Sequence, residues 1–201
     1  MNKNILAFGA HPDDVEFGCG GTLLLLKGLG YKITIIDLTR GEKAKYGATE
    51  RLREAEKARK ILGVERKILN FGDKNISLSE KHKKEVKEII EQYTPSIIFA
   101  PYFKDKHTDH INTAKLVSEF FPRTIHYYIS DVEDPNIGVD VTKTYKKKIE
   151  ALDAHVTQIR PGDVEWTDKR HKSFGEKLSV EWGELFYIKN KIELPIIFRR
   201  L

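Results

Sequence analysis

Apolar runs alternate with amphipathic segments over the first hundred residues of the chain. Short apolar runs bounded by turns predict buried β-strands, whereas apolar residues at helical spacing predict helices that cover those strands. Gly30 is expected to close the first helix, and Thr49 is expected to cap the second. We therefore expect strands at 4–10, 31–39, 65–71 and 96–101, with helices at 20–30, 50–63 and 79–93 between them.

This alternation of strands and helices favours right-handed crossovers and a parallel sheet. The expected fold is therefore α/β, a Rossmann-like three-layer α/β/α sandwich with a mostly parallel sheet. Beyond residue 122 the pattern changes, and the later elements are expected to finish the sheet or its edge: strands at 124–130, 136–141, 184–190 and 194–198, with a helix at 142–155. No flexible linker divides the chain, so residues 1–201 are expected to form a single domain.

Composition narrows the class of protein further. With 40% hydrophobic and 32% charged residues, the chain can bury a substantial core. There is no run of 18 apolar residues and no apolar N-terminal run typical of a signal peptide, so we expect a cytoplasmic protein with no integral membrane segment. The lone Cys19 cannot form an internal disulfide, which agrees with a reducing compartment.

The net charge of +5 raises the question of a nucleic-acid partner. The densest basic segments, 51–60 and 81–92, contain glutamates at helical spacing. Such segments are usually solvated helix faces with ion pairs between successive turns. We therefore expect no nucleic-acid partner.

Three polar segments follow predicted strands, at 11–14, 39–47 and 102–110. Ligands of an open α/β sheet bind at the carboxyl ends of its strands, so these segments should meet at one active site. The glycines after the first strand do not have the G-x-G-x-x-G spacing, and the acidic residues before them would repel a pyrophosphate. A cation is therefore expected there rather than a dinucleotide.

His11 and Asp14 are three residues apart across a turn, and His110 in "HTDH" can supply a third ligand from a neighbouring strand end. Two histidines and one carboxylate with open positions suit catalytic Zn²⁺, and equally non-haem Fe²⁺. Each motif alone also has a structural interpretation, in which Asp13 or Asp14 caps the following helix and "HTDH" caps the helix after it. Their combination at adjacent strand ends favours the metal site.

Five segments occur in the order expected of one known family: "AHPDDVEFGCGG", "TRGE", "YGATERLREAEKARKILGV", "HTDH" and "KKIEALDAHVTQ". Over residues 5–158 the chain resembles the PIG-L or LmbE-like zinc N-deacetylases. This family includes N-acetylglucosaminyl-phosphatidylinositol de-N-acetylases and the deacetylases of mycothiol and bacillithiol synthesis. The A-H-P-D-D and H-x-D-H motifs are its most specific features.

The resemblance implies that His11, Asp14 and His110 bind Zn²⁺ and that Asp13 is the general base. The implied reaction is hydrolysis of the acetamide of an N-acetylated amino sugar, giving an amine and acetate. The substrate would be a small molecule: a GlcNAc-type sugar, a glycoconjugate or a sugar nucleotide. Many members of the family are oligomers, so a homo-oligomer is expected.

Further residues have roles that the resemblance suggests. A protonated His107 would stabilise the oxyanion of the tetrahedral intermediate, with Asp109 holding it protonated and oriented. Arg51 and His155 match family residues and are expected to bind substrate. Their alternative interpretations are a surface ion pair for Arg51 and a contact with a helix dipole for His155. Several aromatic residues offer stacking faces to a sugar ring: Tyr102, Phe103, Tyr127, Tyr128 and Trp166.

Two other classes of function remain open from the sequence. A non-haem Fe²⁺ oxygenase would use the same three ligands but would leave Asp13 without a role. By resemblance, such oxygenases have an antiparallel β-barrel instead of alternating strands and helices. A non-catalytic sugar-binding module would keep the fold and lack turnover, and it is disfavoured because the three ligands and Asp13 are all present.

Overall fold

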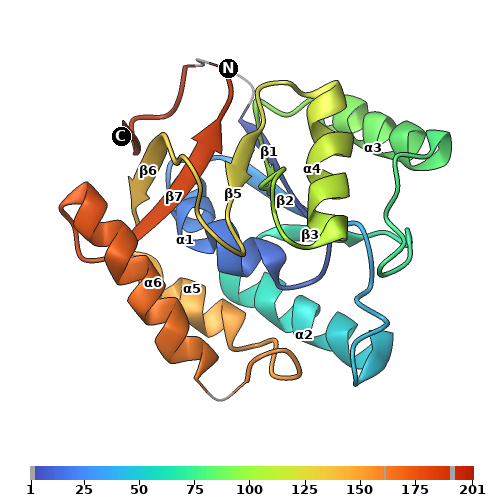
Figure 1. The fold of residues 1–201 in the computed structure, drawn as a ribbon, viewed down its shortest axis with the longest axis horizontal. Coiled ribbons are helices and arrows are strands. Elements are labelled where there is room, and N and C mark those ends of the chain that lie inside the picture. The colour runs from blue at the N-terminus through green and yellow to red at the C-terminus, as the bar shows by residue number, and fades with distance from the viewer. Residues whose placement is uncertain (1–2, 161, 191–192) are drawn as a thin grey trace.

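The computed structural model describes residues 3–160, 162–190 and 193–201. These residues form one eight-stranded sheet and the helices that cover it (Figure 1). The strands are β1 (Asn4–Gly9), β2 (Lys32–Asp37), β3 (Glu65–Ile68), β4 (Ile97–Pro101), β5 (Ile125–Tyr127), β6 (Ile137–Asp140), β7 (Gly183–Ile188) and β8 (Phe198–Arg200). The helices are α1 (Asp14–Gly28), α2 (Gly47–Leu62), α3 (Glu80–Tyr93), α4 (Thr108–Phe120), α5 (Tyr145–Leu152) and α6 (Asp163–Leu178).

The strand order is β3-β2-β1-β4-β5-β7-β6-β8. The first five strands in this order are parallel, and β7, β6 and β8 continue the sheet in antiparallel pairs. The expected Rossmann-like α/β fold with a mostly parallel sheet is therefore confirmed. Because β1 lies between β2 and β4, the strand order reverses beside it, and ligands of such sheets bind at this switch point.

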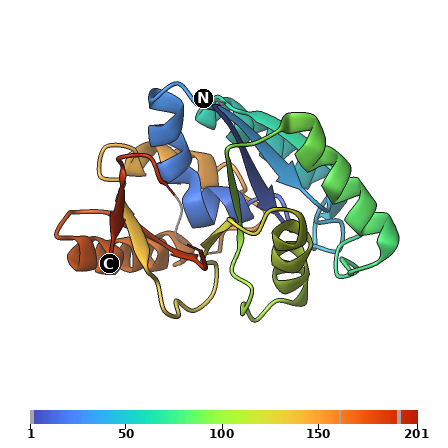
Figure 2. The ribbon, with the colours of Figure 1, turned by 90° about the horizontal axis from the view of Figure 1, so that it is seen from above.

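The helices form a layer on each face of the sheet. Figure 1 shows α3 and α4 together on one side of the strands and α2, α5 and α6 on the other. Leu23 of α1, Leu62 of α2 and Ala151 of α5 belong to one buried apolar cluster, while Val86 of α3 and Leu116 of α4 belong to a second. Figure 2 shows the C-terminal strand at the end of the sheet that lies away from α3.

The first helix begins at Asp14, six residues before the expected start at residue 20, so it includes the glycine-rich stretch after the first strand. Its glycines allow close approach of other elements. A Cβ at Gly18 would lie 2.0 Å from the Tyr127 ring, and one at Gly21 would lie 2.9 Å from Val141. The sequence pattern does not distinguish glycines that allow close packing of other side chains from glycines that end a helix.

Two further elements differ from expectation. The polar segment after residue 160 forms α6, which the sequence analysis did not predict. Its buried side chains Phe174 and Leu178 pack on Leu185 of β7. The last strand begins at Phe198, whereas 194–198 was expected.

The two edge strands of the sheet are short. Strand β3 has four residues, "ERKI", and β8 has three, "FRR". Within the described parts of the chain, no helix is both long and apolar enough to cross a membrane.

Candidate metal centre and active site

Three candidate metal ligands meet at the carboxyl ends of β1 and β4. His11 lies between β1 and α1, Asp14 is the first residue of α1, and His110 lies in the first turn of α4. One ligand atom from each lies within 4.8 Å of the others, and all three residues are buried. The fold thus brings together the two motifs that the sequence analysis assigned to one metal site.

The two oxygens of Asp14 have different environments. Its Oδ2 accepts the backbone N–H groups of Ala10 and His11 at 2.8 and 2.9 Å, while its Oδ1 lies 3.3 Å from His110 Nε2. His11 Nδ1 lies 3.7 Å from Asp14 Oδ2. Tetrahedral zinc with nitrogen and oxygen ligands separates its ligand atoms by about 3.4 Å, so this spacing suits such an ion.

In both ligand histidines, His11 and His110, a carboxylate contacts the ring nitrogen that faces away from Asp14. His110 Nδ1 hydrogen-bonds Asp105 Oδ1 at 3.0 Å. His11 Nε2 lies 3.3 Å from Asp73 Oδ1 and 3.3 Å from Asp109 Oδ2. A histidine that ligates a metal usually contacts a carboxylate or carbonyl through its other nitrogen, so both rings are oriented as metal ligands require.

Sequence reasoning missed Asp73 and Asp105. Asp105 lies in the predicted polar segment 102–110, five residues before His110. This short separation in sequence could have indicated a contact between the two side chains. Asp73 follows β3, whose carboxyl end is not among the three polar segments considered from the sequence.

The buried carboxylates give the centre an excess of negative charge. Burial alone lowers the pKa of His11, but hydrogen bonds to carboxylates outweigh it and raise that pKa to about 12. The pKa of His110 likewise rises to about 9, because Asp14 and Asp105 oppose the effect of burial. A divalent cation would balance the negative charge of these carboxylates in place of the extra protons on His11 and His110.

Asp13 lies beside the three ligands with its side chain 23% exposed. Its φ of 123° is one that residues with a side chain rarely adopt, and such strain often occurs at functional positions. Burial raises the pKa of its carboxyl group; Arg51 opposes that rise, and the neighbouring Asp14 adds to it. A carboxyl group in this environment is suited to accept and return a proton.

Arg51 is buried and contacts Asp13, not solvent. Its Nη2 lies 3.1 Å from Asp13 Oδ1 and also donates to the Pro12 carbonyl. Gly41, at φ 62°, leaves room for it, since a Cβ there would lie 2.7 Å from the guanidinium carbon. In the structure Arg51 is buried and pairs with Asp13, so it does not form the surface ion pair considered from the sequence, and its contact with substrate stays a prediction.

His107 caps α4, and its Nδ1 accepts the backbone N–H of Asp109 at 3.2 Å. The ring proton therefore resides on Nε2. Burial lowers the pKa of His107, and the adjacent His110 and His11 lower it further. The Asp109 carboxylate accepts the N–H of Lys74 at 2.7 Å and faces His11 instead of holding His107.

His155 is fully buried below the site. Its Nε2 lies 3.4 Å from Oε1 of Glu16, a carboxylate that also pairs with buried Arg66. The structure therefore does not bring His155 to a surface that a substrate can reach. Its side chain belongs to a charged network under α1.

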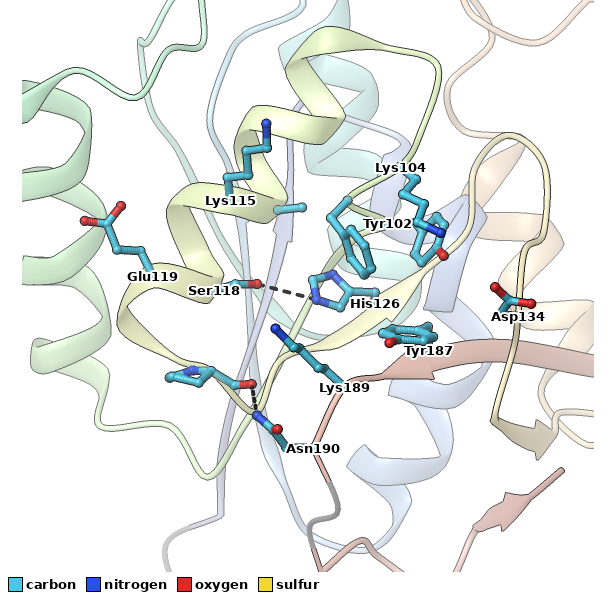
Figure 3. Close-up of a pocket in the computed structure, with 13 residues that line it drawn as sticks. Tyr102, Lys104, Lys115, Ser118, Glu119, His126, Asp134, Tyr187, Lys189 and Asn190 are labelled. Carbon is cyan, nitrogen blue, oxygen red and sulfur yellow. Dashed lines mark hydrogen bonds between the residues drawn. The ribbon is translucent and has the colours of Figure 1, made fainter.

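A pocket of about 260 Å³ opens directly beside Asp13 and Asp14. Of the five aromatic residues considered for stacking, Trp166 lines this pocket, whereas Tyr102, Tyr127 and Tyr128 are buried. A second cavity, of about 710 Å³, lies between α4 and the β5–β7 part of the sheet (Figure 3). Phe103 and His126 line that cavity, and none of the candidate ligands does, so it is separate from the metal centre.

Comparisons with known proteins show which proteins this chain is similar to. A model of the family described as GlcNAc-PI de-N-acetylase, PIG-L, matches residues 6–121, which include all three candidate ligands and Asp13. The Uncharacterized deacetylase YaiS of Escherichia coli K12 is 36% identical over 116 residues, which cover 54% of this chain and 63% of that protein. The match thus spans less than two thirds of YaiS.

Two other relatives align over most of this chain. The diacetylchitobiose deacetylase of Thermococcus kodakarensis is 27% identical over 198 residues, covering 81% of this chain and 72% of that protein. The crystal structure of the conserved protein TT1542 from Thermus thermophilus superposes with a TM-score of 0.90 at 27% identity, covering 98% of both chains. These findings confirm the resemblance seen in the sequence, and the chain belongs to the PIG-L family of de-N-acetylases.

Proposed function

We propose that the protein is a zinc-dependent N-deacetylase that hydrolyses the acetamide of an N-acetylated amino sugar to an amine and acetate. The observation that carries this proposal is the convergence of His11, Asp14 and His110, with a carboxylate oriented beside them by Arg51. The named activities of the deacetylase relatives support the reaction, and the diacetylchitobiose deacetylase supports a GlcNAc-type substrate.

Zinc fits the donor set. Two imidazole nitrogens and one carboxylate oxygen, with open positions on the pocket side, are the ligands of many catalytic zinc sites. When bound, zinc supplies a Lewis acid that polarises the acetamide carbonyl and lowers the pKa of water to near 7. His11, Asp14 and His110 would hold it.

Asp13 then performs the proton transfers. Its carboxylate takes a proton from the attacking water as the water oxygen bonds to the acetamide carbonyl carbon. When the carbon–nitrogen bond breaks, the same carboxyl group returns that proton to the departing nitrogen, which leaves as an amine. Arg51 holds the carboxylate toward the site during both steps.

His107 acts as a neutral hydrogen-bond donor in this proposal. Because its Nδ1 accepts a backbone N–H, its Nε2–H is available to the oxygen that becomes negatively charged in the tetrahedral intermediate. A donor fixed by a helix cap needs no reorientation when that charge develops.

The test is metal analysis of the purified protein combined with amine release from a panel of N-acetylated sugars. We expect one zinc per chain and release that a chelator abolishes and added zinc restores. Bound metal without release from any sugar would contradict the substrate class, and absence of metal would contradict the proposed centre.

The alternative functions are less well supported. The Fe²⁺ oxygenase gives Asp13 and Arg51 no role, and its expected β-barrel is not the fold of this chain. A sugar-binding module without turnover would not need a strained carboxylate beside the ligands. The expected homo-oligomer stays a prediction.

A further inference from the structure

The pocket beside Asp13 has an aromatic wall. Phe17, in the first turn of α1, lines the same pocket as Asp13, the residue that precedes the helix. Phe17 and Trp166 of α6 stack with ring centroids 5.6 Å apart and planes inclined by 9°. We call this pair the Phe17–Trp166 platform; both rings line the pocket.

Trp166 is exposed although it stacks on Phe17. Half of its surface, 50%, is accessible, which is unusual for a large aromatic side chain in a folded protein. Because Trp166 lines the pocket, its exposed surface is available for stacking against a ligand.

A partly buried arginine fixes the platform. The guanidinium carbon of Arg170 lies 5.2 Å from the Trp166 ring and 5.6 Å from the Phe17 ring. Its two terminal nitrogens donate to the carbonyls of Ser130 and Tyr128 at 2.7 and 3.2 Å. The platform is therefore held between α1, α6 and the segment after β5, and it presents a rigid surface.

The remaining wall of the pocket combines apolar and polar groups. Ile129, Leu152 and Ile159 are apolar, whereas Gln158 and Asp163 carry polar groups. A flat aromatic surface beside an amide and a carboxylate matches a pyranose ring, which has an apolar C–H face and hydroxyl groups at its edge.

We propose that the Phe17–Trp166 platform binds the pyranose ring that carries the acetamide, and that Trp166 determines the preference of the enzyme for cyclic N-acetylhexosamines over acyclic acetamides. This inference rests on the proposed function. An acetamide on a ring seated against the platform would reach toward Asp13 and Asp14, because both carboxylates line the same pocket as the platform.

The test compares kcat/KM for N-acetylglucosamine with kcat/KM for N-acetylethanolamine in the zinc-loaded protein. In Trp166→Ala we expect the ratio of these two values to fall by about tenfold, mainly through KM for the sugar, because the loss of stacking affects only the ring. Trp166→Phe should retain most of the preference. Leu29→Ala, an exposed apolar residue at the other end of α1, is the matched control and should keep the wild-type ratio.

A second readout does not depend on turnover. The chain has two tryptophans, and sugar bound to the platform should change the fluorescence of Trp166. We expect N-acetylglucosamine to change the emission of the wild type and not that of Trp166→Phe. If N-acetylglucosamine changes the fluorescence but no acetamide is hydrolysed, the result contradicts the proposed function and supports sugar binding at the platform. If Trp166→Ala hydrolyses both substrates with the wild-type kcat/KM ratio, the result contradicts the proposed role of the platform and leaves the proposed function unaffected.

Discussion

Asp13 combines partial exposure, a left-handed backbone and an ion pair with buried Arg51. Because its carboxylate is not one of the three proposed ligands, it can be removed without removing the metal. We expect Asp13→Ala to lower kcat by about 100-fold or more, the size of a general-base contribution, while the protein keeps its zinc. His110→Ala should instead lose the zinc. Equal activity of Asp13→Ala and the wild type would exclude the proposed mechanism.

Asp105 supports the centre without contacting the metal. It accepts hydrogen bonds from His110 Nδ1, from the His107 backbone and from the Ser130 hydroxyl. Loss of such a partner weakens metal binding, so Asp105→Ala should lower zinc affinity by about 10- to 100-fold in a competition titration with a chelator. Asp131→Ala removes an exposed carboxylate that pairs with exposed Lys106, and it should leave the affinity unchanged. Equal affinities of the two variants would refute this role.

The two ligand histidines predict how metal binding depends on pH. Without metal, the pKa of His11 is raised to about 12 and that of His110 to about 9, so both rings carry a proton at pH 6. Zinc binds neutral imidazole, and binding at pH 6 should therefore release about two protons. His107 is not one of the proposed ligands, so its proton is not part of this number. Calorimetry in buffers of different ionisation enthalpy measures this number, and zinc affinity should fall as the pH falls.

Helix α1 begins with the ligand Asp14 and directly follows His11 and Asp13, and its position depends on glycine. Gly18 faces the Tyr127 ring so closely that a Cβ would clash, whereas Gly28, in the last turn of the same helix, has nothing within 4 Å of its Cβ position. We expect Gly18→Ala to lower the free energy of unfolding by about 1–3 kcal/mol or more through overpacking. Gly28→Ala should be neutral or stabilise by up to about 1 kcal/mol. Urea denaturation of both variants measures the difference, and equal stabilities would contradict the packing argument.

Strands β1, β2 and β4 were predictable from the sequence because their apolar runs are nearly continuous. Helix α6 was not, because the buried side chains of α6 are spread among lysines and glutamates. Its packing partner on β7 follows soon after it in the sequence, yet periodicity alone does not reveal that contact.

The candidate ligands were predictable because each belongs to a polar segment that follows a strand which the apolar pattern identifies. The contacts of Arg51 and His155 were not, since burial under α1 depends on how α2 and the 153–159 segment pack. Glu54 of α2 accepts the N–H and the hydroxyl of Thr157 at 2.7 Å each, which joins the two segments. No local sequence signal encodes such a contact.

At the scale of the molecule, metal binding should stabilise the fold. The ligands come from the segments after β1 and β4, which lead into α1 and α4. Because these helices lie on opposite faces of the sheet, a bound metal would connect the two layers. At free zinc 100 times above Kd the gain is about 2.7 kcal/mol. For a chain of this size that corresponds to a rise in Tm of roughly 5–10 °C. Thermal denaturation with and without a chelator measures it, and the rise should be absent in His110→Ala. A rise of the same size in that variant would show zinc binding elsewhere.

The edge strands of the sheet affect how copies of this chain can associate. An exposed edge strand is a template on which another chain can add a strand, and proteins commonly prevent this with short, charged edges. Here the outermost strands β3 and β8 are four and three residues long and expose Glu65, Lys67, Arg199 and Arg200. Such edges discourage strand-by-strand growth into aggregates or a continuous intermolecular sheet. Contact between copies is thereby directed to the helical faces and connecting loops.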